Sequence, residues 1–179
     1  MAKSLLVNLP CRESIPDYLQ VITPTKAIAR SLNVPHYSLE SLAETVVKKQ
    51  GWKIASALMA SRVLQEAIRE TWGDGDLVGI ARKVAPTLNS LWHGGIDFEE
   101  LQQYPSIRVK KLATLALVYQ QKLREQKAIA PAELFWQASQ TVNNTNSYLF
   151  YGYFTPGIER IAFINAIARD KSIICLLYT

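Results

Sequence analysis

Short, almost continuously apolar runs lie near the two ends of the chain, and they predict β-strands. Each run is rich in β-branched, leucine or aromatic residues and is bounded by proline or polar residues. Runs without a polar alternate position are typical of strands that are covered on both faces, as in a parallel sheet. The predicted strands are Ser4–Leu9, Leu19–Thr23, Tyr148–Phe154 and Ser172–Tyr178.

A helical pattern separates the last two predicted strands. Gly157–Arg169 is apolar over most of its surface, which suits a helix that packs on a sheet. A strand, a helix and a strand within about 30 residues predict a βαβ unit with parallel strands and a right-handed crossover. A shorter helix, Lys26–Leu32, is predicted directly after the strand Leu19–Thr23.

The middle of the chain shows apolar residues every three or four positions, which predicts a series of helices. Ser38 is a suitable N-cap for the first of them, and Gly51 ends it. Pro131 stands where a proline is favoured, in the first turn of the last helix. The other predicted helices are Lys53–Trp72, Leu77–Trp92, Phe98–Gln103, Ser106–Lys127 and Ala132–Thr141.

These elements predict an α/β fold in which a small, mostly parallel sheet is interrupted by a large all-helical insertion, so that helix predominates. The α/β lobe comprises residues 1–35 and 147–179, and the helical subdomain comprises residues 36–146. Because the sequence stops directly after a predicted strand, we expect it to be a fragment whose later residues complete the sheet.

Composition agrees with a folded, cytoplasmic protein. Hydrophobic residues make up 49% and charged residues 20% of the 179 residues. No apolar run approaches the roughly 18 residues that a membrane span requires. Cys11 and Cys175 are far apart and form no metal pattern, so two reduced thiols are expected. His36 and His93 have no partners at ligand spacing, and no metal or catalytic role is predicted for them.

Basic residues are concentrated in the predicted helix Ser106–Lys127. The net charge of the chain is +5, and this segment alone holds six basic residues and one acid, Glu125. The basic residues are Arg108, Lys110, Lys111, Lys122, Arg124 and Lys127. Clustered cations can mark a surface that binds a phosphate backbone. The alternative is an ordinary solvated helix face. We assign Arg108, Lys111 and Lys122 as candidate nucleic-acid contacts.

No nucleotide-binding loop is present in the sequence. Such a loop needs glycines that aim backbone N–H groups at the phosphates, followed by Lys and Ser or Thr. The turn after the first predicted strand reads Pro10-Cys11-Arg12-Glu13-Ser14 and has neither feature. We therefore expect no ATP binding, no cofactor and no catalytic residue in this chain.

The turn after the second predicted strand carries the most specific chemistry. In the stretch VITPTKAIARSL, a strand ends in Thr-Pro-Thr-Lys and a helix follows. Hydroxyls, helix N-terminal N–H groups and the Lys26 ammonium suit a phosphate group. The alternative is an ordinary strand-to-helix turn in which a threonine caps the helix. The candidate residues for nucleic-acid binding are Thr23, Pro24, Thr25, Lys26 and Arg30.

This stretch resembles motif Ia of superfamily 1 helicases, which contacts single-stranded DNA. The order of the later segments resembles the N-terminal part of AddB/RecB-type helicase–nuclease proteins over residues 19–179: SLESLAETV, a helical insertion, a long basic helix, APAELFWQA and LFYGYFTPGIERIAFINAIA. The resemblance implies a P-loop-NTPase or helicase-like lobe. In active relatives the strand at YLFYGYF would end in an acidic pair, but the turn Tyr151–Pro156 has no acid. The lobe therefore looks like an inactivated one.

The resemblance leads to one functional hypothesis and two alternatives. The hypothesis is a non-catalytic helicase-like module of a DNA repair or recombination protein of the PD-(D/E)XK nuclease family. It would hold single-stranded DNA, or bind the remainder of its own polypeptide or a helicase–nuclease partner subunit, away from membranes. One alternative is a protein–protein interaction scaffold that does not touch DNA. The other is part of an enzyme whose catalytic residues lie beyond Thr179. Tyr151, Tyr153 and Phe154 could stack on bases or simply pack in the sheet.

Overall fold

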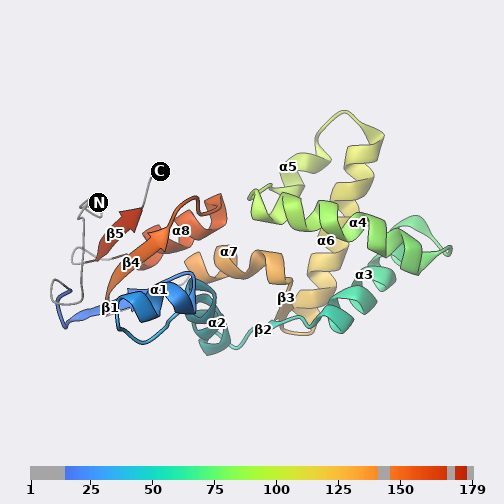
Figure 1. The fold of residues 1–179 in the computed structure, drawn as a ribbon. Helices are drawn as coiled ribbons and strands as arrows, with labels where there is room; N and C mark the ends of the chain where they lie inside the picture. The colour runs from blue at the N-terminus through green and yellow to red at the C-terminus, as the bar shows by residue number, and fades with distance from the viewer. Residues whose placement is uncertain (1–14, 141–145, 169–171, 177–179) are drawn as a thin grey trace. The chain divides into compact units, whose positions relative to one another are not determined.

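The computed structural model describes residues 15–140, 146–168 and 172–176 (Figure 1). The predicted strand Ser4–Leu9 and the turn that contains Cys11 lie outside these residues. The chain divides into two compact units, which are described separately. The first unit comprises Met1–Val46 and Phe135–Thr179, and the second comprises Val47–Leu134.

The first unit is built on a parallel sheet. Its strands are β1 (Leu19–Ile22), β4 (Ser147–Tyr153) and β5 (Ile173–Leu176), in the order β1-β4-β5. Leu19 lies opposite Ser147, Leu149 lies opposite Ile173, and both pairings are parallel. Because α8 (Ile158–Ile167) joins the parallel strands β4 and β5, the predicted βαβ unit is confirmed.

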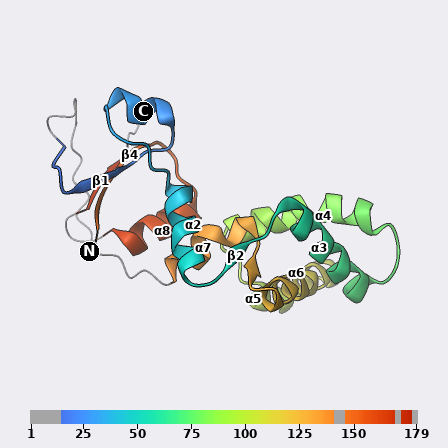
Figure 2. The same cartoon turned by 90° about the horizontal axis from the view of Figure 1, so that it is seen from below.

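Helices cover both faces of this sheet. On one face Leu19, Val21 and Leu149 are buried and pack with Leu32 at the end of α1 (Lys26–Ser31). On the other face Tyr148 and Phe150 are fully buried. Figure 2 shows α1 and α8 on opposite sides of the strands. The near-continuous apolar pattern of the strands is explained by this double coverage.

A glycine sets the approach of α1 to β4. Gly152 has φ +85°, and a Cβ atom there would lie 2.9 Å from Cδ1 of Ile28 and 3.5 Å from Cδ of Pro24. A Cβ atom there would be too close to the Ile28 side chain of α1 and would touch Pro24, and the positive φ would be strained for any side chain. The backbone of β4 and the turn that holds Pro24 are thus in close contact because position 152 has no side chain.

The second unit is a helical bundle around one long helix. Its helices are α3 (Ala57–Trp72), α4 (Leu77–His93), α5 (Phe98–Gln102) and α6 (Ile107–Glu125). Leu115, Ala116, Tyr119 and Leu123 of α6 are buried and belong to the core of the bundle. The ring of Trp92 meets those of Phe98 and Tyr119 at centroid distances of 5.2 and 5.6 Å. These aromatic contacts join α4, α5 and α6 in one core.

The insertion is not all-helical, which corrects the prediction. Lys53–Ile54 forms strand β2, which pairs in parallel with β3 (Ala128–Ile129). The predicted helix Lys53–Trp72 therefore begins only at Ala57, where Oγ of Ser56 accepts a hydrogen bond from the backbone N–H of Met59 at 3.2 Å. Two-residue strands have too few positions for a period of two, so no sequence pattern indicated them.

The remaining helices lie close to the predicted ones. The short 3₁₀ helix Pro131–Glu133 lies directly before α7 (Leu134–Ser139). The division between the units falls inside α2 (Leu39–Lys49) and inside α7, after the first residue of α7. Both helices were placed in the insertion by sequence, but most residues of each belong to the sheet unit. In the described part of the chain, no helix has the length and hydropathy needed to cross a bilayer.

Candidate nucleic-acid interface

The turn after β1 is shaped by its own threonines. Thr23 is fully buried, and its Oγ1 donates to the backbone oxygen of Thr25 at 3.3 Å. Oγ1 of Thr25 accepts from the N–H of Ile28 at 3.3 Å and so caps α1. Pro24 is half-buried against Gly152. The Thr23 hydroxyl therefore fixes the turn and is not available to a ligand from solvent.

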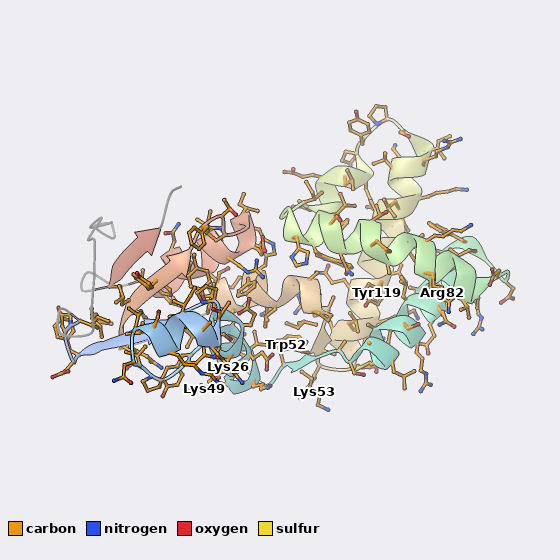
Figure 3. The ribbon with its side chains drawn as sticks, viewed as in Figure 1. Lys26, Lys49, Trp52, Lys53, Arg82 and Tyr119 are labelled. Atoms are coloured by element: carbon orange, nitrogen blue, oxygen red, sulfur yellow. The ribbon has the colours of Figure 1, made fainter. Side chains whose placement is uncertain are left out.

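The positive charge of this turn is exposed. Lys26 and Arg30 lie four residues apart on α1, which puts them on the same side of the helix. Both side chains are exposed, and neither makes an ion pair with any residue that the structure describes. Figure 3 shows Lys26 on α1. Of the five candidates in this turn, these two can reach a phosphate group most readily.

One aromatic residue at the same edge of the sheet is accessible. Because β1 and β4 are parallel, the residues after Ile22 and after Tyr153 lie at one edge. Tyr151 is half-buried and packs in the cluster of Leu19 and Leu149. The hydroxyl of Tyr153 accepts from the N–H of Leu39 at 3.3 Å, and burial raises the pKa of Tyr153 to about 12.

Phe154 differs from these two tyrosines. Its side chain is 49% exposed, whereas Tyr153 is 7% exposed. Phe154 is therefore the residue of the three that could stack on a base, and the two tyrosines serve the packing of the sheet.

In the second half of α6 the cations have acidic partners. Nζ of Lys122 lies 2.7 Å from Oε2 of Glu70 on α3, and this hydrogen bond raises the pKa of Lys122 above its ordinary value. Nη2 of Arg124 lies 3.2 Å from Oε1 of Glu133. The charge of Lys122, a predicted contact residue, is thus already neutralised by an acid of its own unit.

Glu133 is the centre of a buried polar network. Its side chain is 5% exposed, and it also accepts from Nε2 of Gln120 at 2.6 Å and from the N–H of Ala130 at 2.9 Å. The guanidinium of Arg124 lies 4.8 Å from the ring centroid of Trp52. Burial, with the charge of Glu133, raises the pKa of Tyr119 to about 12. This network ties α6 to the segment that follows β3.

The first half of α6 is different. Arg108, Lys110 and Lys111 are exposed, and none of them makes an ion pair or hydrogen bond through its side chain with another described residue. The first turn of the helix contains no acidic residue. The candidates Arg108 and Lys111 therefore keep their charge available to an external anion.

The sequence analysis missed a further group of basic residues. The N–H of Lys53 donates to the backbone oxygen of Lys127 at 2.8 Å, so the pairing of β2 and β3 brings these two exposed lysines together. Lys49 lies just before them at the end of α2, and Figure 3 shows Lys49, Trp52 and Lys53 along this part of the chain. The sequence signal for this group is the stretch KKQGWK, whose pattern by itself indicates only the end of a helix.

Other kinds of site find little support among the described residues. In that part of the chain no group of three or more His, Cys, Asp and Glu residues is placed to hold a metal ion. A groove of about 680 Å³ runs along β1, and its lining includes Leu19, Val21, Val34 and Tyr37. Among the described residues that line it, Asp17 is the one with a charge, and an acid does not attract a phosphate group.

Comparison with known protein families and with curated protein sequences finds no match for this chain.

Proposed function

We propose that this chain is a non-catalytic, helicase-like module that holds single-stranded DNA in a DNA repair or recombination protein. The main support is the edge of the sheet at which β1 and β4 end. Lys26 and Arg30 lie there on α1, exposed and without an ion pair to any residue that the structure describes, and the threonines before them are held by their own hydrogen bonds. In open α/β sheets, ligands bind at the carboxyl ends of the strands.

The chemistry of this edge suits a nucleic-acid backbone. Lys and Arg neutralise phosphates without reading sequence, and Phe154 offers an exposed aromatic face for an unpaired base. Thr25 adds an exposed hydroxyl next to Lys26. Lys122 contributes less than Arg108 and Lys111, because Glu70 already neutralises it.

Among the residues that the structure describes, the turn directly after β4 has no acidic pair of the kind that could hold magnesium and activate water. The residues from Phe154 to Gly157, directly after β4, include no acid. The first acid is Glu159, which is 5% exposed and lies in α8, with its carboxylate close to the backbone of Gly157. This arrangement is in keeping with a module that binds without turning over a nucleotide.

A second candidate function is an interaction scaffold for the rest of the polypeptide or a partner subunit. It is favoured by the outer face of α8, where Ile158 and Ile161 are 58% and 42% exposed and lie three residues apart. Exposed apolar side chains on one helix face fit a protein partner better than DNA.

The proposal is tested by fluorescence anisotropy of a labelled single-stranded oligonucleotide at several salt concentrations. We expect Lys26→Ala to weaken binding without changing sequence preference and to lower the salt slope by about 0.7, the value for one lost phosphate contact. Lys83→Ala, which removes an exposed lysine of α4, is the matched control. Absence of binding by the wild-type chain at low salt would refute the DNA function and favour the scaffold.

A further inference from the structure

The connection between α5 and α6 ends in an exposed group of apolar and basic side chains. Gln102, the last residue of α5, donates through Nε2 to Oγ1 of Thr114 at 3.2 Å. The turns of α6 before Thr114 therefore extend past the end of α5, as Figure 1 shows. We call this group the α5–α6 tip. It consists of Tyr104, Ile107, Arg108, Lys110 and Lys111.

The large apolar residues of the tip are unusually accessible. Tyr104 is 58% exposed and Ile107 is 73% exposed. Further along the same helix, Leu115, Tyr119 and Leu123 are at most 5% exposed. The tip thus presents an aromatic ring and an aliphatic side chain to solvent, at a place where the bundle core does not need them.

The cations of the tip lie near the N-terminus of α6, where the helix dipole disfavours positive charge. The N-terminus of a helix carries a partial positive charge, so acids are stabilising there and Lys or Arg are not. Arg108, Lys110 and Lys111 lie in the first turns of a 19-residue helix, and no acid lies in its first turn. Helical spacing places Lys111 beside both Ile107 and Arg108. Fold stability does not account for this arrangement, whereas an anionic partner does.

We infer that the α5–α6 tip is a second contact point for single-stranded nucleic acid, in which Tyr104 stacks on an unpaired base while Arg108 and Lys111 bind the flanking phosphates. This inference extends the proposed function to the helical unit and rests on it. An exposed ring next to cations is the combination that holds a single strand without sequence preference. In a duplex the base faces are already stacked, so Tyr104 should favour single strands.

A membrane surface fits the tip less well. A helix that lies on a bilayer presents a long apolar face to the lipid. The apolar face of α6 is instead used for the bundle core, and the apolar part of the tip is limited to Tyr104 and Ile107. An anionic vesicle is therefore the competing ligand that the experiment includes.

The experiment measures binding of the 179-residue chain to labelled single-stranded and duplex oligonucleotides by anisotropy at several salt concentrations. For Arg108→Glu/Lys111→Glu we expect a salt slope lower by about 1.4, from two lost phosphate contacts, and a loss of affinity of at least tenfold at low salt. For Tyr104→Ala we expect about a fivefold or larger loss for the single strand, from one lost stacking contact, and little change for the duplex.

Matched controls come from the same chain. Arg82→Glu/Lys83→Glu makes the same change of net charge on exposed residues of α4 in the same unit, and Figure 3 labels Arg82. Tyr18→Ala removes a tyrosine that is 63% exposed in the other unit. Both controls should bind within twofold of wild type.

A second readout separates binding from folding. Because acids are favoured at a helix N-terminus, Arg108→Glu/Lys111→Glu should raise the Tm while it lowers affinity. Loss of binding together with a lowered Tm would instead indicate damage to the fold and would overturn the inference.

The remaining outcomes are also decisive. If the tip variants bind like wild type while Lys26→Ala weakens binding, the tip inference is wrong and the proposed function stands. If the wild-type chain binds no oligonucleotide, both are wrong. If the tip variants lose binding to phosphatidylserine vesicles but not to the oligonucleotide, the tip is a membrane contact.

Discussion

The two halves of α6 are both basic but use their charges differently. In the second half, Lys122 is bound to Glu70 and Arg124 to the buried Glu133. In the first half, Arg108 and its neighbouring lysines have no acidic partner among the residues that the structure describes. A count of positive charge along the helix would treat the halves alike. The difference shows that a cation in a basic segment counts toward a binding surface only if no acidic residue of the same protein already neutralises it.

The largest expected effect on stability comes from removing Glu133, the buried acid that binds Arg124 in the second half of α6. Glu133→Ala leaves the guanidinium of Arg124 and the N–H of Ala130 without their buried acceptor. We expect a loss of about 3 kcal/mol in the free energy of unfolding, measured by urea denaturation.

Two variants sharpen this first prediction. Glu125→Gln alters an exposed acid that accepts from Gln121, and should cost no more than about 0.5 kcal/mol. Glu133→Gln keeps a hydrogen-bond acceptor of similar shape, so its loss in the free energy of unfolding should lie between those of Glu125→Gln and Glu133→Ala. Equal stability of Glu133→Ala and wild type would show that the second half is not fixed by this network.

The next effect concerns alkaline pH. The pKa of Tyr119 is about 12 in the folded chain and 10.0 as its ordinary value. Between these values the unfolded chain has lost the phenolic proton and the folded chain keeps it, so stability falls as pH rises. We expect Tyr119 to account for about 1–2 kcal/mol of this fall between pH 10 and 12.

Comparison with Tyr119→Phe isolates this contribution. The variant should match wild type near neutral pH and lose less stability between pH 10 and 12, as followed by thermal unfolding. Deprotonation of Tyr153 and of Lys122 in alkali also destabilises the fold, because both groups have a raised pKa. The quantity to measure is therefore the difference in stability between the wild-type chain and Tyr119→Phe. Identical pH profiles would contradict the burial of the Tyr119 hydroxyl.

The smallest effect should come from the exposed ion pair. Lys122→Met removes a pair whose side chains are 25% and 57% exposed, so water screens the attraction and the free energy of unfolding should change only slightly. Binding of single-stranded DNA should stay within twofold of wild type, because Lys122 is already neutralised. A loss as large as that of the tip variant would mean that both halves of α6 contact DNA.

Much of the fold could be predicted from the sequence because its signals are local. The apolar runs of β1 and β4 and the cap residues Ser38 and Thr25 act over a few neighbouring residues. The pairing of β2 with β3 depends on residues more than 70 positions apart. No short-range pattern marks such a pair, and Lys53 was therefore assigned to a helix.

The candidate site was less predictable, because exposure and pairing depend on the tertiary structure. That Lys26 and Arg30 are exposed follows from their place after a buried strand. That Lys122 meets Glu70 depends on how α3 packs on α6, and that Glu133 is buried depends on how the chain turns after β3. Neither contact can be predicted from one sequence, because each depends on how distant parts of the chain pack together.

Gly152 has a consequence for any survey of variants that affect DNA binding. It carries no charge and no side chain, yet the space it leaves open is what lets the turn at Pro24 and the Ile28 side chain sit against β4. An alanine there would strain the backbone at φ +85° and crowd the Ile28 side chain on the helix that carries Lys26, some 126 positions earlier in the sequence. A screen for DNA binding would then score Gly152 as a binding position although it has no side chain to contact a ligand, and adding charge elsewhere on α1 would not relieve the strain.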